Sequence, residues 1–378
     1  MILYFIILYH ILICFVGTWK DFTKYQMPCQ VLKQRWFQHG KRTDVLIHAV
    51  SCGEAMAMIP VMAYLTKCGI EYTLSIHTYT GYTLIKKIAP YDVNIILKPY
   101  DLLLNMFLFF GQLRPKAIII SESDTCPCFL FVAKIFRIPI FYMNYKYKPE
   151  KPLRNQLHRF IAKRIYTQNY TPSASYTFVG NLKFLAVKKD KRRCGKPGLR
   201  PTIIIASAGE DEIEIHLNYI RAFPNVRFIY VPRHLSWDVR PHFDRLNRPY
   251  TVITEDLFID DNNILICSAF GMLDKLYKKA NICLMGDTFN KVGGHNLIEP
   301  AIQQNAIILG PNYHTCKEIA DMLHITYVTS ETDLIRNTKV LLDNYKDIGQ
   351  ENQSRILTCR MKIKKAFKEA MDEIISTL

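Results

Sequence analysis

Several patterns that define common protein classes are missing from this chain. No cysteines have the C-x-x-C spacing of a structural zinc site, and the eleven cysteines are scattered, with one close pair at Cys126 and Cys128. Scattered thiols are typical of a reducing compartment rather than of a disulfide framework. The chain also has no Asp-x-Asp motif, no internal repeat and no low-complexity segment. We therefore expect no disulfide scaffold, no metal site and no obligatory divalent ion.

No motif of a DNA- or RNA-binding fold occurs either, although the chain is strongly basic. Its 378 residues carry a formal net charge of +16, and 49% of them are hydrophobic. This composition is typical of a globular protein, and the length allows about two domains. The positive charge favours acidic partners such as anionic lipids and phosphorylated substrates, with a general bias towards lysine as the alternative. Nucleic acid is not expected as a partner.

The N-terminus is an apolar run that extends to Gly17. It lacks the basic start and the evident cleavage site of a secretory signal peptide, and it is at the short limit of a membrane span. Four basic residues follow it: Lys20, Lys24, Lys33 and Arg35. By the positive-inside rule they place the body of the protein in the cytoplasm. We expect residues 1–18 to form a single membrane anchor, with a buried core helix as the alternative.

Short β-branched runs alternate with helical stretches through most of the chain. Ten runs are typical of buried strands: 45–50, 72–76, 93–97, 117–120, 139–143, 203–206, 227–231, 264–267, 282–285 and 306–309. Runs with so few polar residues suit parallel sheets that are covered on both faces. The alternation therefore predicts two doubly wound α/β domains.

The domains are expected at residues 30–185 and 201–378, joined by a basic linker rich in glycine and proline at 186–200. The second ends in a helical tail from Glu331. Ligands of doubly wound sheets bind at the carboxyl ends of the strands, so we expect the functional site in a cleft between the domains.

A carboxylate is expected at the end of the first strand. After Val50, Gly53 allows a turn and Glu54 begins a helix. A carboxylate there can act as a general base towards a sugar hydroxyl, although a glutamate in a first turn also simply favours a helix. Ser51 is either the N-cap of this helix or a ligand to the substrate.

Hydroxyl groups also follow the second strand, between Ser75 and Tyr82. Thr80 is a candidate for binding polar substrate groups, with helix capping as the alternative for this stretch. The segment 101–110 is apolar nearly all round, which favours a buried helix, whereas partial exposure would give it a lipid-docking face.

The second domain contains the most informative segment, Gly-Gly-His-Asn-Leu-Ile-Glu-Pro at 293–300. Gly293 and Gly294 allow a turn that a β-carbon would obstruct, and a helix is expected from Asn296. A helix start suits a phosphate, and Glu299 in its first turn can accept hydrogen bonds from sugar hydroxyls. The segment therefore predicts a nucleotide-sugar site, with a simple tight turn as the alternative.

Two further strand ends contribute to this candidate site. Ser207 follows the strand at 203–206, where its hydroxyl and neighbouring N–H groups could hold a phosphate. Pro232 and Arg233 follow the next strand, and the guanidinium could pair with a phosphate or frame a base. A surface arginine without a ligand is the alternative, and the acidic run 210–212 is expected only to begin a helix.

In this order, the segments resemble the Kdo transferases, the lipid IVA 3-deoxy-D-manno-octulosonic acid transferases. The resemblance depends on these stretches: 48–54, 80–81, 99–101, 114–116, 180–184, 232–234, 276–277, 293–300, 310–311 and 317–319. It implies a GT-B fold, with two Rossmann-like domains facing a cleft and an N-terminal membrane-anchor helix. It also implies the inner membrane as the location, with the catalytic body on the cytoplasmic side.

The resemblance further implies inverting transfer of Kdo from CMP-Kdo to the lipid A precursor, without a cofactor. The family's catalytic base matches Glu54, and its CMP site matches Arg233 and the loop 293–299. Glu122 matches the first glutamate of the family element M-E-T-E-x-W-P-N, and we count it with Ser51, Gly53 and Thr80 as a substrate-binding candidate.

Several positions depart from the family pattern. In the M-E-T-E-x-W-P-N element, which corresponds to residues 121–128, Cys126 replaces the tryptophan. The serine–threonine–histidine loop of the second domain is Ser207-Ala208-Gly209, which loses two polar groups. The base and the nucleotide loop remain, but their surroundings differ. The alternatives are therefore a GT-B transferase with another donor or acceptor, or a degenerate, non-catalytic relative that binds anionic glycolipid.

Overall fold

The computed structural model describes residues 16–23, 26–36, 40–89, 93–171, 173–187, 200–234, 236–253, 264–269 and 271–378. They form two compact units, Met1–Ala186 with Lys362–Leu378, and Val187–Met361. Nearly all of the expected anchor at 1–18 and most of the linker at 186–200 lie outside the described residues. Within the described ranges, no helix combines the length and the apolar character that crossing a bilayer requires.

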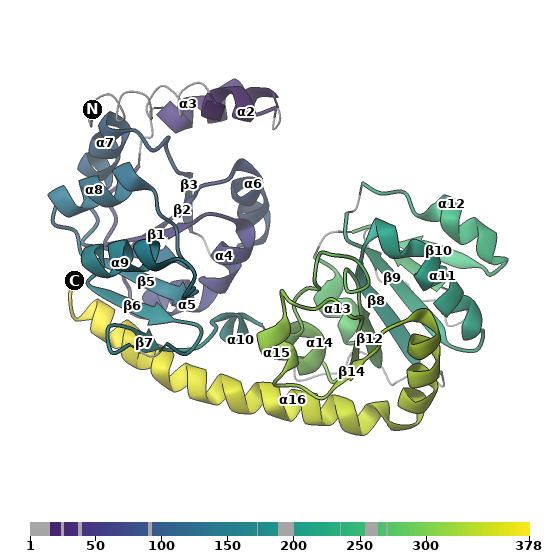
Figure 1. Ribbon diagram of the computed structural model, residues 1–378. Helices are drawn as coiled ribbons and strands as arrows, with labels where there is room; N and C mark the ends of the chain where they lie inside the picture. The colour runs from purple at the N-terminus through teal and green to yellow at the C-terminus, as the bar shows by residue number, and fades with distance from the viewer. Residues whose placement is uncertain are drawn as a thin grey trace. The chain divides into compact units, whose positions relative to one another are not determined.

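The first unit is built on a parallel sheet in the order β3-β2-β1-β4-β5-β6-β7 (Figure 1). Its strands are β1 (Val45–Ala49), β2 (Tyr72–Ile76), β3 (Asn94–Leu97), β4 (Ala117–Ser121), β5 (Ile140–Tyr145), β6 (Arg164–Thr167) and β7 (Thr177–Phe178). The five strands expected here are confirmed with nearly the same bounds. The short strands β6 and β7 were not expected.

Helices cover both faces of this sheet. The chain passes outwards from β1 to β3 and restarts at β4, so right-handed crossovers place two groups of helices on opposite faces. One group is α4 (Cys52–Ala57), α5 (Ile59–Lys67) and α6 (Tyr79–Ile88), and the other is α7 (Leu103–Leu113), α8 (Pro127–Ile135) and α9 (Pro152–Ile161) (Figure 1). The reversal of strand order lies between β1 and β4, where doubly wound sheets bind ligands.

Shorter helices complete this unit: α2 (Thr18–Thr23), α3 (Cys29–Trp36) and α10 (Lys183–Ala186). The helical tail is confirmed as α16 (Glu331–Ile375), and its last residues belong to the first unit. There Tyr64 donates a hydrogen bond to Asp372 (2.5 Å), and Arg164 forms an ion pair with Glu373 (2.9 Å).

The second unit has a parallel sheet in the order β10-β11-β9-β8-β12-β13-β14. Its strands are β8 (Thr202–Ala208), β9 (Arg227–Pro232), β10 (Tyr250–Ile253), β11 (Ile264–Cys267), β12 (Ile282–Met285), β13 (Ala306–Leu309) and β14 (Ile325–Tyr327). The helices between them are α11 (Ile213–Ala222), α12 (Arg240–Phe243), α13 (Leu273–Tyr277), α14 (Ile298–Ile302) and α15 (Lys317–Ala320), with 3₁₀ turns at Glu210–Glu212 and Asp244–Leu246. The five expected strands are again confirmed, and the edge strands β10 and β14 are additional.

Two expectations about helices were wrong in part. The helix after the glycine pair begins at Ile298 rather than at Asn296, because the Asn296 side chain accepts a hydrogen bond from the Ile298 N–H (3.1 Å) and closes a turn before the helix. The apolar helix α7 is buried on one face only: Leu104 and Leu108 are 70% and 47% exposed. Its other face packs on α8 and the sheet through Met106, Phe109 and Phe110.

Candidate active site

Glu54 lies in the first turn of α4, directly after β1. Ser51 is the N-cap of this helix, as its hydroxyl oxygen accepts a hydrogen bond from the Glu54 N–H (3.3 Å). The Val50 N–H donates to the Glu54 carboxylate (2.9 Å). Gly53 is helical, and a β-carbon added there would meet no atom closer than 3.9 Å, so the expected turn does not require glycine.

The environment of Glu54 favours a proton acceptor. Burial raises the pKa of its carboxyl to about 7, and the nearby charges of Glu122 and Asp124 raise it too, while the hydrogen bonds from Val50 and Ser51 oppose the shift. Ser121, at the end of β4, donates a hydrogen bond to the Glu54 carbonyl (3.3 Å) and ties the two segments together. A carboxylate with a pKa near the working pH is suited to general base catalysis.

Thr80 is exposed in the first turn of α6. The neighbouring Thr78 caps this helix by accepting a hydrogen bond from the Gly81 N–H (3.3 Å), so capping is confirmed for Thr78. A β-carbon on Gly81 would lie 2.9 Å from the Cys52 nitrogen. Glycine at this position therefore allows α6 to begin close to α4. Binding of substrate by Thr80 stays a prediction.

Replacing Glu54 by glutamine is expected to stabilise the protein at alkaline pH. The folded state binds the Glu54 proton more tightly than the unfolded state between pH 4.5 and about 7, so this carboxyl lowers stability as pH rises through that window. One pKa unit corresponds to about 1.4 kcal/mol, and partial exposure reduces the effect, so we expect the variant to gain about 1–3 kcal/mol at about pH 8 and less at about pH 5.

Urea denaturation at both pH values measures this difference. The exposed Glu71→Gln is the matched control and should change the free energy of unfolding by less than about 0.5 kcal/mol. A Glu54→Gln variant that is less stable than the wild type at alkaline pH would contradict the raised pKa.

In the second unit, one buried glutamate joins two strand ends. The Glu212 carboxylate accepts hydrogen bonds from the N–H groups of Gly209 (3.3 Å), Asp287 (2.7 Å) and Phe289 (2.6 Å). These residues follow the neighbouring strands β8 and β12. Glu212 therefore does more than begin a helix: it holds together the loops that carry the predicted nucleotide site.

The glycine pair folds back on Asp287. The N–H groups of Gly293 and Gly294 donate to the Asp287 carbonyl (2.9 and 2.8 Å), and His295 pairs with the Asp287 carboxylate (2.7 Å). Both glycines have positive φ angles, and a β-carbon on Gly293 would lie 2.3 Å from the His314 ring. The need for glycine at this turn is confirmed. Because both glycine N–H groups are used inside the turn, they are not available to a ligand.

The other predicted residues of this site lie at the same edge of the sheet. Ser207 sits at a bulge in β8 with φ +57°, and the N–H of Arg233, directly after Pro232 at the end of β9, donates to the Ala208 carbonyl (2.9 Å). Burial lowers the pKa of His295, and the charge of Arg233 lowers it further, so the guanidinium lies within electrostatic reach of the glycine loop. In that loop Asn296 donates a hydrogen bond to Glu299 (2.9 Å).

Comparisons with known proteins show what the chain is similar to. Residues 30–185 match the family model described as 3-deoxy-D-manno-octulosonic-acid transferase (kdotransferase). The 3-deoxy-D-manno-octulosonic acid transferase of Aquifex aeolicus is 25% identical over 88% of this chain and 94% of its own length. The protein of the same name from Haemophilus influenzae is 25% identical over 89% of this chain and 88% of its own.

Among solved structures, UDP-GlcNAc 2-epimerase from Neisseria meningitidis bound to UDP-GlcNAc shares the fold. Its TM-score is 0.60 at 16% identity, over 86% of this chain and 99% of that one. The two doubly wound units and the matched sequences define a glycosyltransferase of the GT-B type. Residues 30–185 are thus identified as a 3-deoxy-D-manno-octulosonic acid (Kdo) transferase domain, and relatives of that name match most of the chain.

Proposed function

We propose that this chain is an inverting transferase that moves Kdo from CMP-Kdo to the lipid A precursor, lipid IVA. The observation that carries the proposal is the half-buried Glu54 carboxylate, whose pKa of about 7 and place after β1 suit a general base. The relatives named 3-deoxy-D-manno-octulosonic acid transferases, which match over most of the chain, support the donor sugar.

In the proposed mechanism, Glu54 takes the proton of the acceptor hydroxyl while its oxygen attacks the anomeric carbon of the donor. The bond from that carbon to the phosphate oxygen breaks, and CMP leaves with the electron pair. Arg233 and Ser207 offset the phosphate charge, and Glu299 accepts hydrogen bonds from sugar hydroxyls. Because CMP is already a good leaving group, no second carboxylate has to act as an acid. A single displacement inverts the anomeric centre.

The decisive experiment is a transfer assay with purified protein, CMP-Kdo and lipid IVA, in which the mass of the lipid product is measured. Competition with CMP-sialic acid and UDP-sugars tests the alternative of another donor. If the protein binds CMP but adds no sugar to lipid IVA under these conditions, the alternative of a non-catalytic relative that binds anionic glycolipid is favoured.

Arg233→Ala is expected to weaken donor binding. A charge-assisted hydrogen bond contributes about 1.5–3 kcal/mol, which corresponds to a rise of about 10- to 100-fold in KM for CMP-Kdo. The exposed Arg240, which follows β9 and pairs with Asp238 (2.8 Å), provides the control, because Arg240→Ala should leave KM unchanged. Equal effects of the two variants would show that only general positive charge matters.

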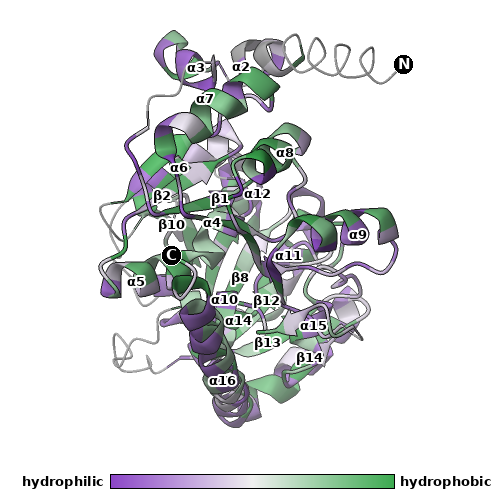
Figure 2. Cartoon of the chain, turned by 90° about the vertical axis from the view of Figure 1, so that its left-hand side faces the viewer, coloured by the Kyte–Doolittle hydropathy of each residue, from purple (hydrophilic) through white to green (hydrophobic). Residues whose placement is uncertain are grey.

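The membrane is part of the same proposal. The helices α7, α8 and α9, with the α8 C-cap Phe136, expose large apolar side chains: Leu104, Phe107, Leu108, Phe131, Ile135, Phe136, Leu153, Leu157 and Phe160. The Phe107 and Phe136 rings are in tilted contact (centroids 5.9 Å apart), and Lys134 lies over the Phe160 ring (5.7 Å), so the three helices form one surface. Figure 2 colours α8 largely as hydrophobic, and none of the three helices contains an acidic residue.

An apolar surface with basic residues and no acidic ones suits anionic lipid. We propose that it docks on the inner membrane from the cytoplasmic side, in addition to a single anchor at 1–18. Lipid IVA would then be taken from the bilayer by the same unit that contains Glu54.

Leu104→Glu combined with Leu108→Glu is expected to raise the KM for lipid IVA presented in anionic vesicles by at least about tenfold, since charged groups replace two apolar side chains at the interface. The KM for detergent-dispersed lipid IVA should stay within about twofold of the wild type, because the two leucines are exposed and away from the core. Val340→Glu, an exposed position in the second unit, is the control. An equal rise in the KM for lipid IVA in vesicles and in detergent would contradict membrane docking.

A further inference from the structure

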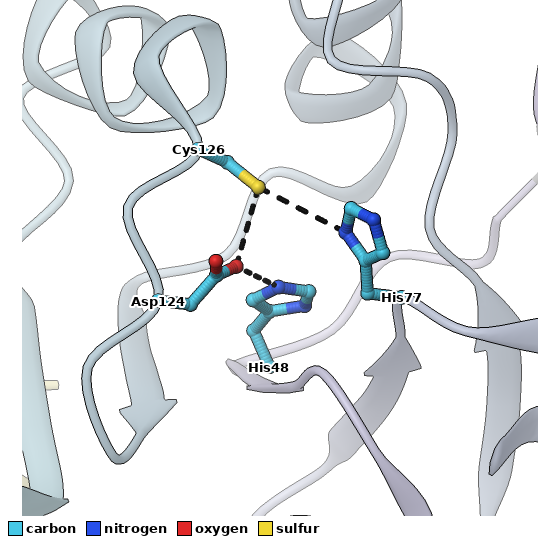
Figure 3. A group of neighbouring side chains, drawn as sticks. All are labelled: His48, His77, Asp124 and Cys126. Carbon is cyan, nitrogen blue, oxygen red and sulfur yellow. Dashed lines mark hydrogen bonds and ion pairs between the residues drawn. The ribbon is translucent and has the colours of Figure 1, made fainter. Parts of the chain in front are cut away.

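Four side chains from three neighbouring strand ends converge in the first unit (Figure 3). His48 lies in β1, His77 follows β2, and Asp124 and Cys126 lie between β4 and α8. One donor atom from each lies within 4.8 Å of all the others. The His48 Nε2–Asp124 Oδ2 distance is 2.8 Å, the Asp124 Oδ2–Cys126 Sγ distance is 3.2 Å, and the Cys126 Sγ–His77 Nδ1 distance is 3.9 Å.

Zinc–ligand bonds of about 2.0–2.3 Å place neighbouring ligand atoms about 3.3–3.7 Å apart in tetrahedral geometry. The three distances above, from 2.8 to 3.9 Å, bracket that separation, and no pair exceeds 4.8 Å, so changes of about 1 Å in these separations would seat the ion. Two imidazoles, one carboxylate and one thiolate form a borderline-soft set that suits zinc and not calcium or magnesium, which prefer oxygen alone.

Outer hydrogen bonds already orient two of the four ligands. The other nitrogen of His48, Nδ1, lies 3.3 Å from the Ser75 hydroxyl, and the other oxygen of Asp124 accepts a hydrogen bond from the Thr125 N–H (2.8 Å). His48 Nε2 and Asp124 Oδ2 are thereby left facing the centre of the cluster. Partners of this kind fix metal ligands in known sites.

The surrounding charges can accommodate a dication. His48 is fully buried and Cys126 is 8% exposed, so the centre is largely shielded from water. The ammonium of Lys98 contacts the Cys126 sulfur and is also paired with Asp101 (3.3 Å), which offsets part of its charge. The Asp124 carboxylate and a Cys126 thiolate would together balance the two positive charges of the ion.

We propose that His48, His77, Asp124 and Cys126 bind one zinc ion. On binding, the Cys126 thiol loses its proton to solvent and no oxidation state changes. Four protein ligands fill a tetrahedral shell, so the site is structural: it links β1, β2 and the segment that carries Glu122. The expectation from the sequence was the opposite, since the four residues share no metal-binding spacing. Cys126 is also one of the departures from the family pattern, so the site would be a property of this chain.

Metal analysis of the full-length chain, purified without chelator, tests the proposal. We expect one zinc ion per chain by mass spectrometry, and a thiolate-to-metal absorption band after replacement by Co²⁺. Loss of even an outer partner lowers affinity about 10- to 100-fold, so Cys126→Ser should weaken Zn²⁺ binding by at least about tenfold and abolish the band. The matched control is Cys128→Ser, because Cys128 is a buried thiol two residues away and outside the cluster. This variant should keep both the Zn²⁺ affinity and the Co²⁺ absorption band.

His77→Gln provides a second route if Cys126→Ser does not fold, with the same expected loss of Zn²⁺ affinity. A wild-type chain that takes up no Zn²⁺ in titration overturns the proposal and leaves a hydrogen-bonded network of Asp124, His48 and Cys126. A cobalt band that survives Cys126→Ser overturns it too. The metal readout does not depend on sugar transfer, so either proposal can fail alone.

Discussion

Glu54→Gln should lower kcat for Kdo transfer by about a hundred- to ten-thousand-fold, the usual contribution of a general base. Glutamine keeps the shape of the side chain and can still accept the hydrogen bond from the Val50 N–H, so α4 should remain intact. The amide cannot take the proton of the acceptor hydroxyl at the moment of attack. Initial rates with CMP-Kdo and lipid IVA give kcat, while binding of CMP alone should not change. Because the same variant is expected to be more stable than the wild type at alkaline pH, unfolding would not explain a loss of turnover.

The pH profile checks the same assignment independently. The wild-type rate should rise with pH through about 7, since the base acts in its deprotonated form. Glu122→Gln removes a neighbouring negative charge that raises the pKa of Glu54. The inflection in the pH–rate profile of this variant should therefore lie at lower pH than in the wild type, and its loss of kcat should be smaller than that of Glu54→Gln. Turnover that survives Glu54→Gln, or a larger loss in Glu122→Gln, would contradict the assignment of the base.

Asp101→Ala is expected to cost the first unit about 3–5 kcal/mol of stability, because it leaves a buried charge without its partner. Lys98 is fully buried, and its ammonium lies 3.3 Å from Asp101. The same carboxylate accepts hydrogen bonds from the N–H groups of Cys128 (3.0 Å) and Phe129 (2.9 Å) in the first turn of α8. The substitution therefore removes an ion-pair partner and the acceptor of two helix N–H groups together. Urea denaturation measures the loss.

Two further variants separate these contributions. Adding Lys98→Met to Asp101→Ala removes the unpaired charge, so part of the lost stability should return. The exposed pair of Lys116 and Asp44 (2.8 Å) is the matched control, and Asp44→Ala should cost less than about 1 kcal/mol. An Asp101→Ala protein as stable as the control would show that Lys98 finds another partner or loses its charge.

The central part of the fold was predictable from the sequence. The ten expected strands form an apolar, β-branched series, and all ten are present because strands buried on both faces need that composition. The four strands that were missed lie at or next to a sheet edge: β6, β7, β10 and β14. Strands there are partly exposed and short, as β7 and β14 show, so no apolar run marks them.

The candidate site was predictable where a residue's role is local. The cap at Ser51, the first-turn position of Glu54 and the need for glycine at Gly293 and Gly294 follow from helix starts and turns within a few residues. The role of Glu212 was missed because its partners Asp287 and Phe289 lie some 75 residues away along the chain. No pattern along the chain announces such a contact.

Two doubly wound domains, a carboxylate at the top of the first sheet and a glycine turn in the second can all be inferred from the order of residues along the chain, because hydrophobic periodicity and backbone sterics act over a few residues. Which strand ends meet depends instead on how the whole sheet is assembled. The pairing of β1 with β2 and with β4 brings His48, His77 and Asp124 together with Cys126, although these residues come from three separate segments of the chain. Strand order in a parallel sheet depends on the packing of the whole domain, and that packing creates the cluster.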